Sequence, residues 1–120
     1  MVKKILIGED EKAIAHALQL KLLNLGYKVK NAFNGEEVIN LVKSERFDLI
    51  LLDLIMPKLD GFEVLTKLKE MKNKTLVIIL SNLSQEEDKQ RARELGAKDF
   101  LVKSSTPLTE IVEKIKKVLV

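Results

Sequence analysis

Apolar positions along the chain follow two spacings that take turns. Five segments of strand length recur, most of them apolar runs and one of them alternating. Each is followed by a longer segment of helix length, and in most of these the apolar residues lie three or four positions apart, as on one face of a helix. The pattern predicts five strands, over residues 3–8, 27–32, 48–53, 75–81 and 98–103. It predicts five helices, over residues 11–25, 34–45, 60–71, 84–95 and 107–119.

Five successive strand–helix units indicate an α/β fold in which helices cover both faces of a doubly wound five-stranded parallel sheet. The first, third and fourth strands are almost wholly apolar, so we expect them in the middle of the sheet. The second strand alternates and the fifth is short, which is typical of edges. With right-handed crossovers these positions fit the strand order 2-1-3-4-5.

Residues that begin and end helices support these boundaries. Three segments have the form of a capping box, in which a side-chain oxygen precedes a carboxylate by three residues: Asn34 with Glu37, Asp60 with Glu63, and Ser84 with Glu87. Pro107 suits a first helical position, and Gly26 and Gly96 suit left-handed ends. No linker or repeat interrupts the series, so we expect a single domain over residues 1–120.

Composition narrows the class of protein. Cysteine is absent, which excludes disulfides and cysteine–metal sites. No apolar stretch approaches the ~20 residues that span a membrane, and the start lacks a signal-peptide pattern, so we expect a cytoplasmic protein without a membrane partner. The net charge is +3, but lysines are spread over every helix, so we expect no direct nucleic-acid binding.

Polar residues occur where four of the strands end. The third strand ends in Asp53, the first is followed by Glu9 and Asp10, the fourth ends at Ser81 and the fifth at Lys103. Parallel strands present their carboxyl ends at one edge of the sheet, which is where open α/β sheets place their ligands. We therefore expect three carboxylates, a hydroxyl and an ammonium group to converge.

This combination favours metal-assisted phosphoryl chemistry. Three neighbouring carboxylates repel one another unless a cation lies between them, and all-oxygen ligands favour Mg²⁺. Asp53 is the candidate nucleophile that would form an aspartyl phosphate, with Lys103 and Ser81 contacting the phosphoryl oxygens. Each residue alone has a plainer interpretation, such as helix capping by Glu9 and Asp10 or surface exposure of Lys103; the joint occurrence at four strand ends favours the site.

Several short motifs extend this set. They are Glu9-Asp10, Asp53 with Met56-Pro57 and Asp60-Gly61, Ser81, and Lys103 preceded by Asp99-Phe100-Leu101-Val102. On these motifs the chain resembles, over essentially its whole length, the receiver domain of two-component response regulators. The resemblance implies the flavodoxin-like (βα)5 receiver fold.

The resemblance also implies residue roles. A histidine kinase or phosphotransfer protein would phosphorylate Asp53 from its phosphohistidine. Asp10 would bind Mg²⁺ directly and Glu9 through water, while Asp53 and the backbone carbonyl of Ile55 would complete the protein ligands. Lys103 would pair with the phosphoryl group.

In such a domain phosphorylation works as a switch. Ser81 would move toward the phosphoryl group and Phe100 would turn inward. The face made by the fourth helix, fifth strand and fifth helix would then signal to a downstream output domain or protein. The resemblance implies a signalling module that catalyses only its own phosphorylation and dephosphorylation, as a monomer or a phosphorylation-dependent homodimer.

Some residues depart from the family pattern. Ser104 stands where the family usually has a proline after a cis peptide bond, and Asn82 stands where it favours a small residue. Ile55 and Leu83 flank the expected site with apolar side chains, and we hypothesise that they restrict attacking water and lengthen the phosphorylated lifetime. His16 is the only histidine and has no acid–base partner nearby in sequence.

Three other functions remain to be compared. A phosphatase of the haloacid dehalogenase type would need two aspartates separated by one residue after the first strand, which Asp10-Glu11-Lys12 does not supply. A flavodoxin-like flavin binder would place a flavin phosphate against the repelling acids of residues 9–11. A receiver-like domain that no longer accepts phosphate is disfavoured by the complete residue set. Whether the chain is a stand-alone receiver or part of a longer protein stays open.

Overall fold

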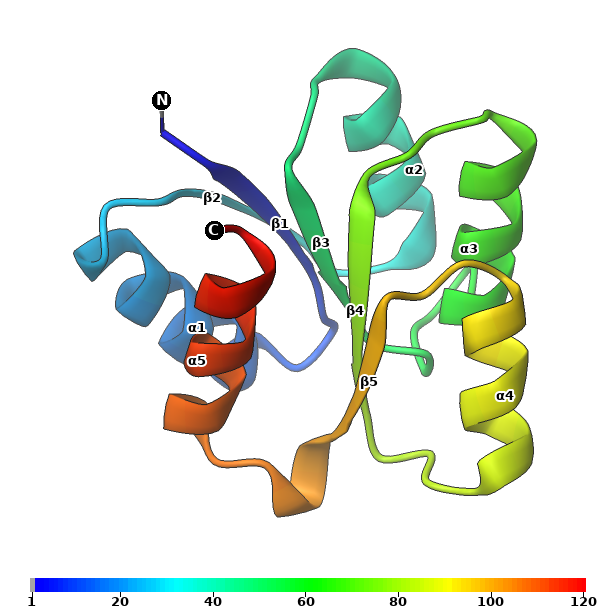
Figure 1. Cartoon of the computed structure of the whole chain (residues 1–120). Coiled ribbons are helices and arrows are strands. Elements are labelled where there is room, and N and C mark those ends of the chain that lie inside the picture. The colour runs from blue at the N-terminus through cyan, green and yellow to red at the C-terminus, as the bar shows by residue number, and fades with distance from the viewer. Residues whose placement is uncertain (1) are drawn as a thin grey trace.

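Five parallel strands form one sheet in the order β2-β1-β3-β4-β5, and helices cover both of its faces (Figure 1). The computed structural model describes residues 2–120. The strands are β1 Lys4–Gly8, β2 Lys28–Ala32, β3 Leu49–Leu52, β4 Leu76–Ser81 and β5 Asp99–Val102. The helices are α1 Lys12–Asn24, α2 Gly35–Ser44, α3 Gly61–Glu70, α4 Glu86–Glu94 and α5 Leu108–Val118, with a 3₁₀ turn at Lys103–Ser105. The predicted fold class and strand order are confirmed.

Side chains of the central strands alternate between two aliphatic cores. On β1, Ile5 and Ile7 join the core beneath α1 and α5, whereas Leu6 joins the core beneath α2, α3 and α4. On β3, Leu49 and Leu51 likewise join the core beneath α1 and α5. Because both faces are covered, the three central strands are apolar at nearly every position, which is why their sequence reads as continuous runs.

Most of the predicted helix ends are found. Asn34 accepts a hydrogen bond from the backbone N–H of Glu37, and Asp60 and Glu63 form a full capping box. Gly26 and Gly96 have positive φ angles of 93° and 107°, as expected just after a helix.

Two predicted helix starts are wrong. Ser84 caps nothing: α4 begins at Glu86, and Gln85 is its N-cap residue without a side-chain cap. The hydroxyl of Ser81 accepts from the backbone N–H of Leu83, and Asn82 accepts from that of Ser104, so these side chains fix the non-helical segment between β4 and α4. Pro107 is the N-cap residue of α5 rather than its first helical residue.

The loop between β3 and α3 packs tightly against two glycines. A methyl group on Gly61 would lie 2.6 Å from the backbone oxygen of Asp53, and one on Gly35 would lie 2.1 Å from that of Leu59. The backbone N–H of Gly61 also donates to the carbonyl of Leu54 at 2.9 Å. These contacts fix the backbone immediately after Asp53.

Within residues 2–120, no helix is both long enough and apolar enough to cross a membrane.

Candidate functional site

The register of the sheet places Glu9 and Asp53 side by side. Gly8 and Leu52 are the last paired residues of β1 and β3, and the N–H of Asp53 donates to the carbonyl of Gly8 at 2.9 Å. Glu9 and Asp53 each follow by one residue. By strand alternation they continue the face of Ile7 and Leu51, on the side of the sheet that α1 and α5 cover.

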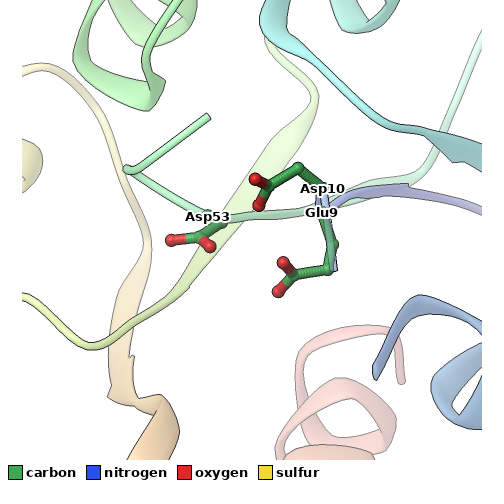
Figure 2. Close-up of side chains that lie close together, drawn as sticks. All are labelled: Glu9, Asp10 and Asp53. Carbon is green, nitrogen blue, oxygen red and sulfur yellow. The ribbon is translucent and has the colours of Figure 1, made fainter. Parts of the chain in front are cut away.

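Burial marks this edge as unusual. Among residues 2–120, only Glu9, Asp53 and Ser81 are polar and buried, and all three lie at the carboxyl ends of strands. Asp10 is exposed beside them. Figure 2 shows the carboxylates of Glu9 and Asp10 turned toward the side on which Asp53 lies. Glu9, Asp10 and Asp53 each offer one oxygen within 4.8 Å of the others, which is a spacing that one cation can bridge.

Lys103 brings the fifth strand into this cluster. Its ammonium nitrogen lies 2.7 Å from Glu9 Oε1, 2.8 Å from Asp53 Oδ2 and 3.1 Å from Glu11 Oε1. The lysine side chain is 10% exposed, so these contacts are largely shielded from water. The side chains of Glu9, Asp10, Asp53 and Lys103 therefore lie together, as the sequence predicted.

The charges in the cluster shift two pKa values. Burial raises the pKa of Glu9 above its ordinary value, and repulsion from Asp53 adds to this, although Lys103 and the N–H of Glu11 oppose the shift. Burial alone would lower the pKa of Lys103, but its hydrogen bonds to Asp53 and Glu9 outweigh burial and raise that pKa. Lys103 is therefore held firmly in its charged form.

Three other predicted residues come from the segment after β3, from β4 and from β5. The N–H of Ile55 donates to Asp53 Oδ1 at 3.2 Å and so orients that carboxylate, while the Ile55 side chain is 55% exposed. Ser81 is fully buried at the end of β4. Phe100 is half-buried on β5, opposite Ile79, and packs on the core beneath α3 and α4. The roles of Ile55 as a metal ligand and of Ser81 and Phe100 as switch residues stay predictions.

Two kinds of contributing residue were not anticipated. Glu11 contacts Lys103 from the start of α1, and only its position two residues after Glu9 could have suggested this. Gly35, the first residue of α2, packs against the loop after Asp53. The only hint in the sequence is that it follows the helix-capping residue Asn34.

Two residues that depart from the family pattern contact each other. Asn82 accepts a 2.8 Å hydrogen bond from the backbone N–H of Ser104, and the described residues contain no cis peptide bond.

Comparison with known proteins identifies what this arrangement resembles. The profile described as "Response regulator receiver domain" matches residues 5–116. The chain is 40% identical over 119 residues to the alkaline phosphatase synthesis transcriptional regulatory protein PhoP of Bacillus subtilis (strain 168), covering 99% of this chain and 49% of that protein. It is 39% identical over 100 residues to the transcriptional regulatory protein DltR of Streptococcus agalactiae, covering 83% of this chain and 45% of that protein.

Solved structures agree with the sequence relatives. The receiver domain of the Francisella response regulator 1452 superimposes with a TM-score of 0.92 at 32% identity, covering 98% of this chain and 96% of that one. The response regulator protein TrrA of Thermotoga maritima, solved in complex with Mg²⁺-BeF, gives a TM-score of 0.86 at 33% identity and covers 98% and 100%. The chain spans about half the length of the curated relatives it matches.

Proposed function

This chain belongs to the response regulator receiver domain family, the signalling modules of two-component systems, and we propose that Asp53 is its phosphoacceptor. The donor would be the phosphohistidine of a histidine kinase or phosphotransfer protein. The observation that carries the proposal is the position of Asp53: it is buried at the carboxyl edge of the sheet, in contact with Lys103 and within 4.8 Å of the other acids.

The transfer itself is a displacement at phosphorus. A carboxylate oxygen of Asp53 attacks the phosphorus atom, a P–O bond forms, and the P–N bond to imidazole breaks with its electron pair going to nitrogen. The N–H of Ile55 orients the carboxylate, and the ammonium group of Lys103, 2.8 Å from Oδ2, offsets negative charge on the incoming group.

The residues present fit a Mg²⁺ ion. In the described part of the chain, Lys103 is the only cation within ion-pair distance of Glu9 and Asp53, and Asp10 has none, so one positive charge faces three carboxylates. Hard oxygen ligands suit Mg²⁺, and the relative TrrA was solved with it. We propose that Asp10, Asp53, the carbonyl of Ile55 and, through water, Glu9 hold the ion, which would neutralise charge on the phosphoryl oxygens.

The switch would run from Ser81 and Phe100 to the face of α4, β5 and α5. A phosphoryl group adds charge and acceptors that favour one of two arrangements. Two features support this route. Ser81 pairs with Val102, the residue before Lys103, and α4 buries only Ala92, so few contacts oppose its displacement.

Loss of the phosphoryl group would be self-catalysed and slow. Ile55 lies beside Asp53 with 55% of its surface exposed, so its side chain is placed where water would approach. We propose that Ile55 and Leu83 lengthen the phosphorylated lifetime.

The wider setting is also a proposal. The chain would act in the cytoplasm as a single domain over residues 1–120, as a monomer or a homodimer that forms on phosphorylation. Its output would be a further domain or a separate protein. The relatives named as transcriptional regulators are about twice as long, so their activities belong to more than the matched region.

Acetyl phosphate with Mg²⁺ tests the proposal directly. Intact-mass measurement is expected to show one added phosphoryl group, absent in Asp53→Asn and absent when a chelator removes the metal. Glu63→Gln, on α3, is the control and should be labelled like the unaltered protein. Undiminished label on Asp53→Asn would place the acceptor elsewhere and contradict the proposal.

A further inference from the structure

The amino-terminal edge of the sheet, opposite Asp53, carries a long depression. It consists of two adjoining hollows of about 550 and 450 Å³, which share residues 73–76 at the start of β4. The first lies between the α2–β3 and α3–β4 loops, and the second between the α3–β4 and α4–β5 loops. We call the two hollows together the basic trough.

Cationic side chains line both hollows of this trough. The first hollow is lined by Lys43, Arg46, Lys72 and Lys74. The second is lined by Lys69, Lys74, Arg93 and Lys98, with no acidic residue among its lining. Within residues 2–120, none of these seven side chains takes part in an ion pair. Their charge is therefore available to a ligand.

The two acids of the trough are already engaged elsewhere. Glu45 forms ion pairs with Lys4 and Lys30, and Asp48 accepts a hydrogen bond from the backbone N–H of Lys4 at 2.8 Å. Those partners hold the pKa of Glu45 below its ordinary value. Glu45 is paired with lysines outside the trough, whereas Asp48 keeps its charge. Seven cations against these two acids still leave the lining net positive, so the trough attracts anions.

The floor of the trough is aliphatic. Leu65 and Leu68 of α3, Leu76 of β4 and Leu95 after α4 line the second hollow. Phe47 is the only aromatic lining residue, and it is 3% exposed. Single-stranded nucleic acids are held by stacking on exposed aromatic rings as well as by positive charge, and the trough offers the charge without the rings.

We propose that the basic trough binds an acidic polypeptide segment of a partner protein. Its carboxylates would pair with the lysines and arginines along the rim, and apolar side chains between them would contact Leu76 and Leu95, the half-buried leucines of the floor. The trough crosses β3, β4 and β5, and neighbouring strands are about 4.8 Å apart, so it accommodates roughly three residues of extended chain. Because it lies opposite Asp53, this contact is separate from the phosphoacceptor site.

Fluorescence anisotropy with a labelled peptide of alternating glutamate and leucine tests the proposal. Lys74→Glu combined with Lys98→Glu is expected to weaken binding at least about tenfold, a loss of roughly 1.4 kcal/mol. Lys21→Glu combined with Lys117→Glu changes the net charge equally on α1 and α5, beneath the other face of the sheet, and is expected to change affinity less than about threefold. Raising the salt from about 0.05 to 0.3 M should weaken binding to the unaltered protein.

The outcomes separate specific binding from the alternatives. Absence of peptide binding, or equal losses in both double variants, would overturn the proposal. Tighter binding of an oligothymidine of equal charge, lost in the trough variant, would assign the trough to nucleic acid and also overturn it. Asp53 labelling by acetyl phosphate checks that each variant folds, and Lys74→Gln with Lys98→Gln provides a milder change that is expected to lower affinity in the same direction.

Discussion

At the scale of single residues, Glu9 carries a charge that the fold compensates only in part. Burial and repulsion from Asp53 raise its pKa, so Glu9 binds a proton more readily in the folded protein than in the unfolded chain. A raised pKa means that the favourable contribution of this group is complete below the ordinary value of 4.5 and is lost as pH rises through the folded value. In metal-free protein at neutral pH, ionised Glu9 is therefore destabilising.

Glu9→Gln should accordingly raise the melting temperature of metal-free protein near neutral pH, and the gain should shrink as the pH falls through the raised pKa of Glu9 toward its ordinary value of 4.5. Thermal melts followed by circular dichroism, with a chelator present, would measure both. Glu11→Gln is the matched control: it also contacts Lys103 but is 57% exposed, so its effect should be small. A gain for Glu9→Gln that is the same at every pH would refute this reasoning.

The gathering of the site residues could be predicted from the sequence because the carboxyl ends of parallel strands lie at the same edge of a sheet. That rule brought Glu9, Asp10, Asp53 and Lys103 together without any structure. It could not reveal Gly35 or Glu11, since their contacts depend on how a loop or side chain packs across elements rather than on position along a strand.

At the scale of elements, α3 and α4 differ in how their starts are fixed. Asp60 accepts from the N–H of Glu63 at 2.8 Å, and the N–H of Asp60 donates back to Glu63 Oε1 at 3.3 Å. The Ser84–Glu87 segment has the same sequence form but no such contact.

Asp60→Ala should therefore lower the free energy of unfolding by about 1 kcal/mol. Ser84→Ala is the matched control and should change it by less than about 0.5 kcal/mol. Urea unfolding of the two variants gives the comparison. A loss at Ser84 equal to that at Asp60 would mean that Ser84 stabilises the start of α4 after all.

The different outcome at Ser84 has a tertiary cause. The sequence pattern correctly predicted that α4 exists, but not where it begins, because hydrogen bonds to the side chains of Ser81 and Asn82 fix the preceding segment in a non-helical conformation. Ser104 supplies one of those partners from 22 residues further along the chain, where a local pattern has no information.

At the scale of the whole molecule, the site couples ion binding to stability. Three carboxylates converge only in the folded protein, so a cation that binds them stabilises that state. Mg²⁺ at about a hundredfold its dissociation constant should stabilise the protein by about 2.7 kcal/mol, raising the melting temperature on the order of 10 °C.

Asp10→Asn should abolish most of that rise, because it removes an exposed carboxylate of the cluster without disturbing a core residue. Differential scanning calorimetry with and without Mg²⁺ would measure it. An equal rise in Asp10→Asn and in the unaltered protein would argue that the ion binds elsewhere.

The overall fold followed from the sequence more fully than the distribution of charge did. Continuous apolar runs predicted the central strands, and the order β2-β1-β3-β4-β5 agrees. The lysines, however, were read as scattered over the helices, whereas seven cationic side chains gather around the basic trough. They come from the last turns of α2, α3 and α4 and from the connections that follow these helices, and only the assembled sheet brings those segments together.

The opposite placement of the acidic cluster and the basic trough makes the domain an electric dipole along its strands. The electric field of an approaching charged macromolecule acts on this dipole before contact. It rotates the domain so that the end of opposite charge faces the macromolecule. Approaching polyanions and polycations are thereby sorted to different ends, even though the net charge of +3 is small.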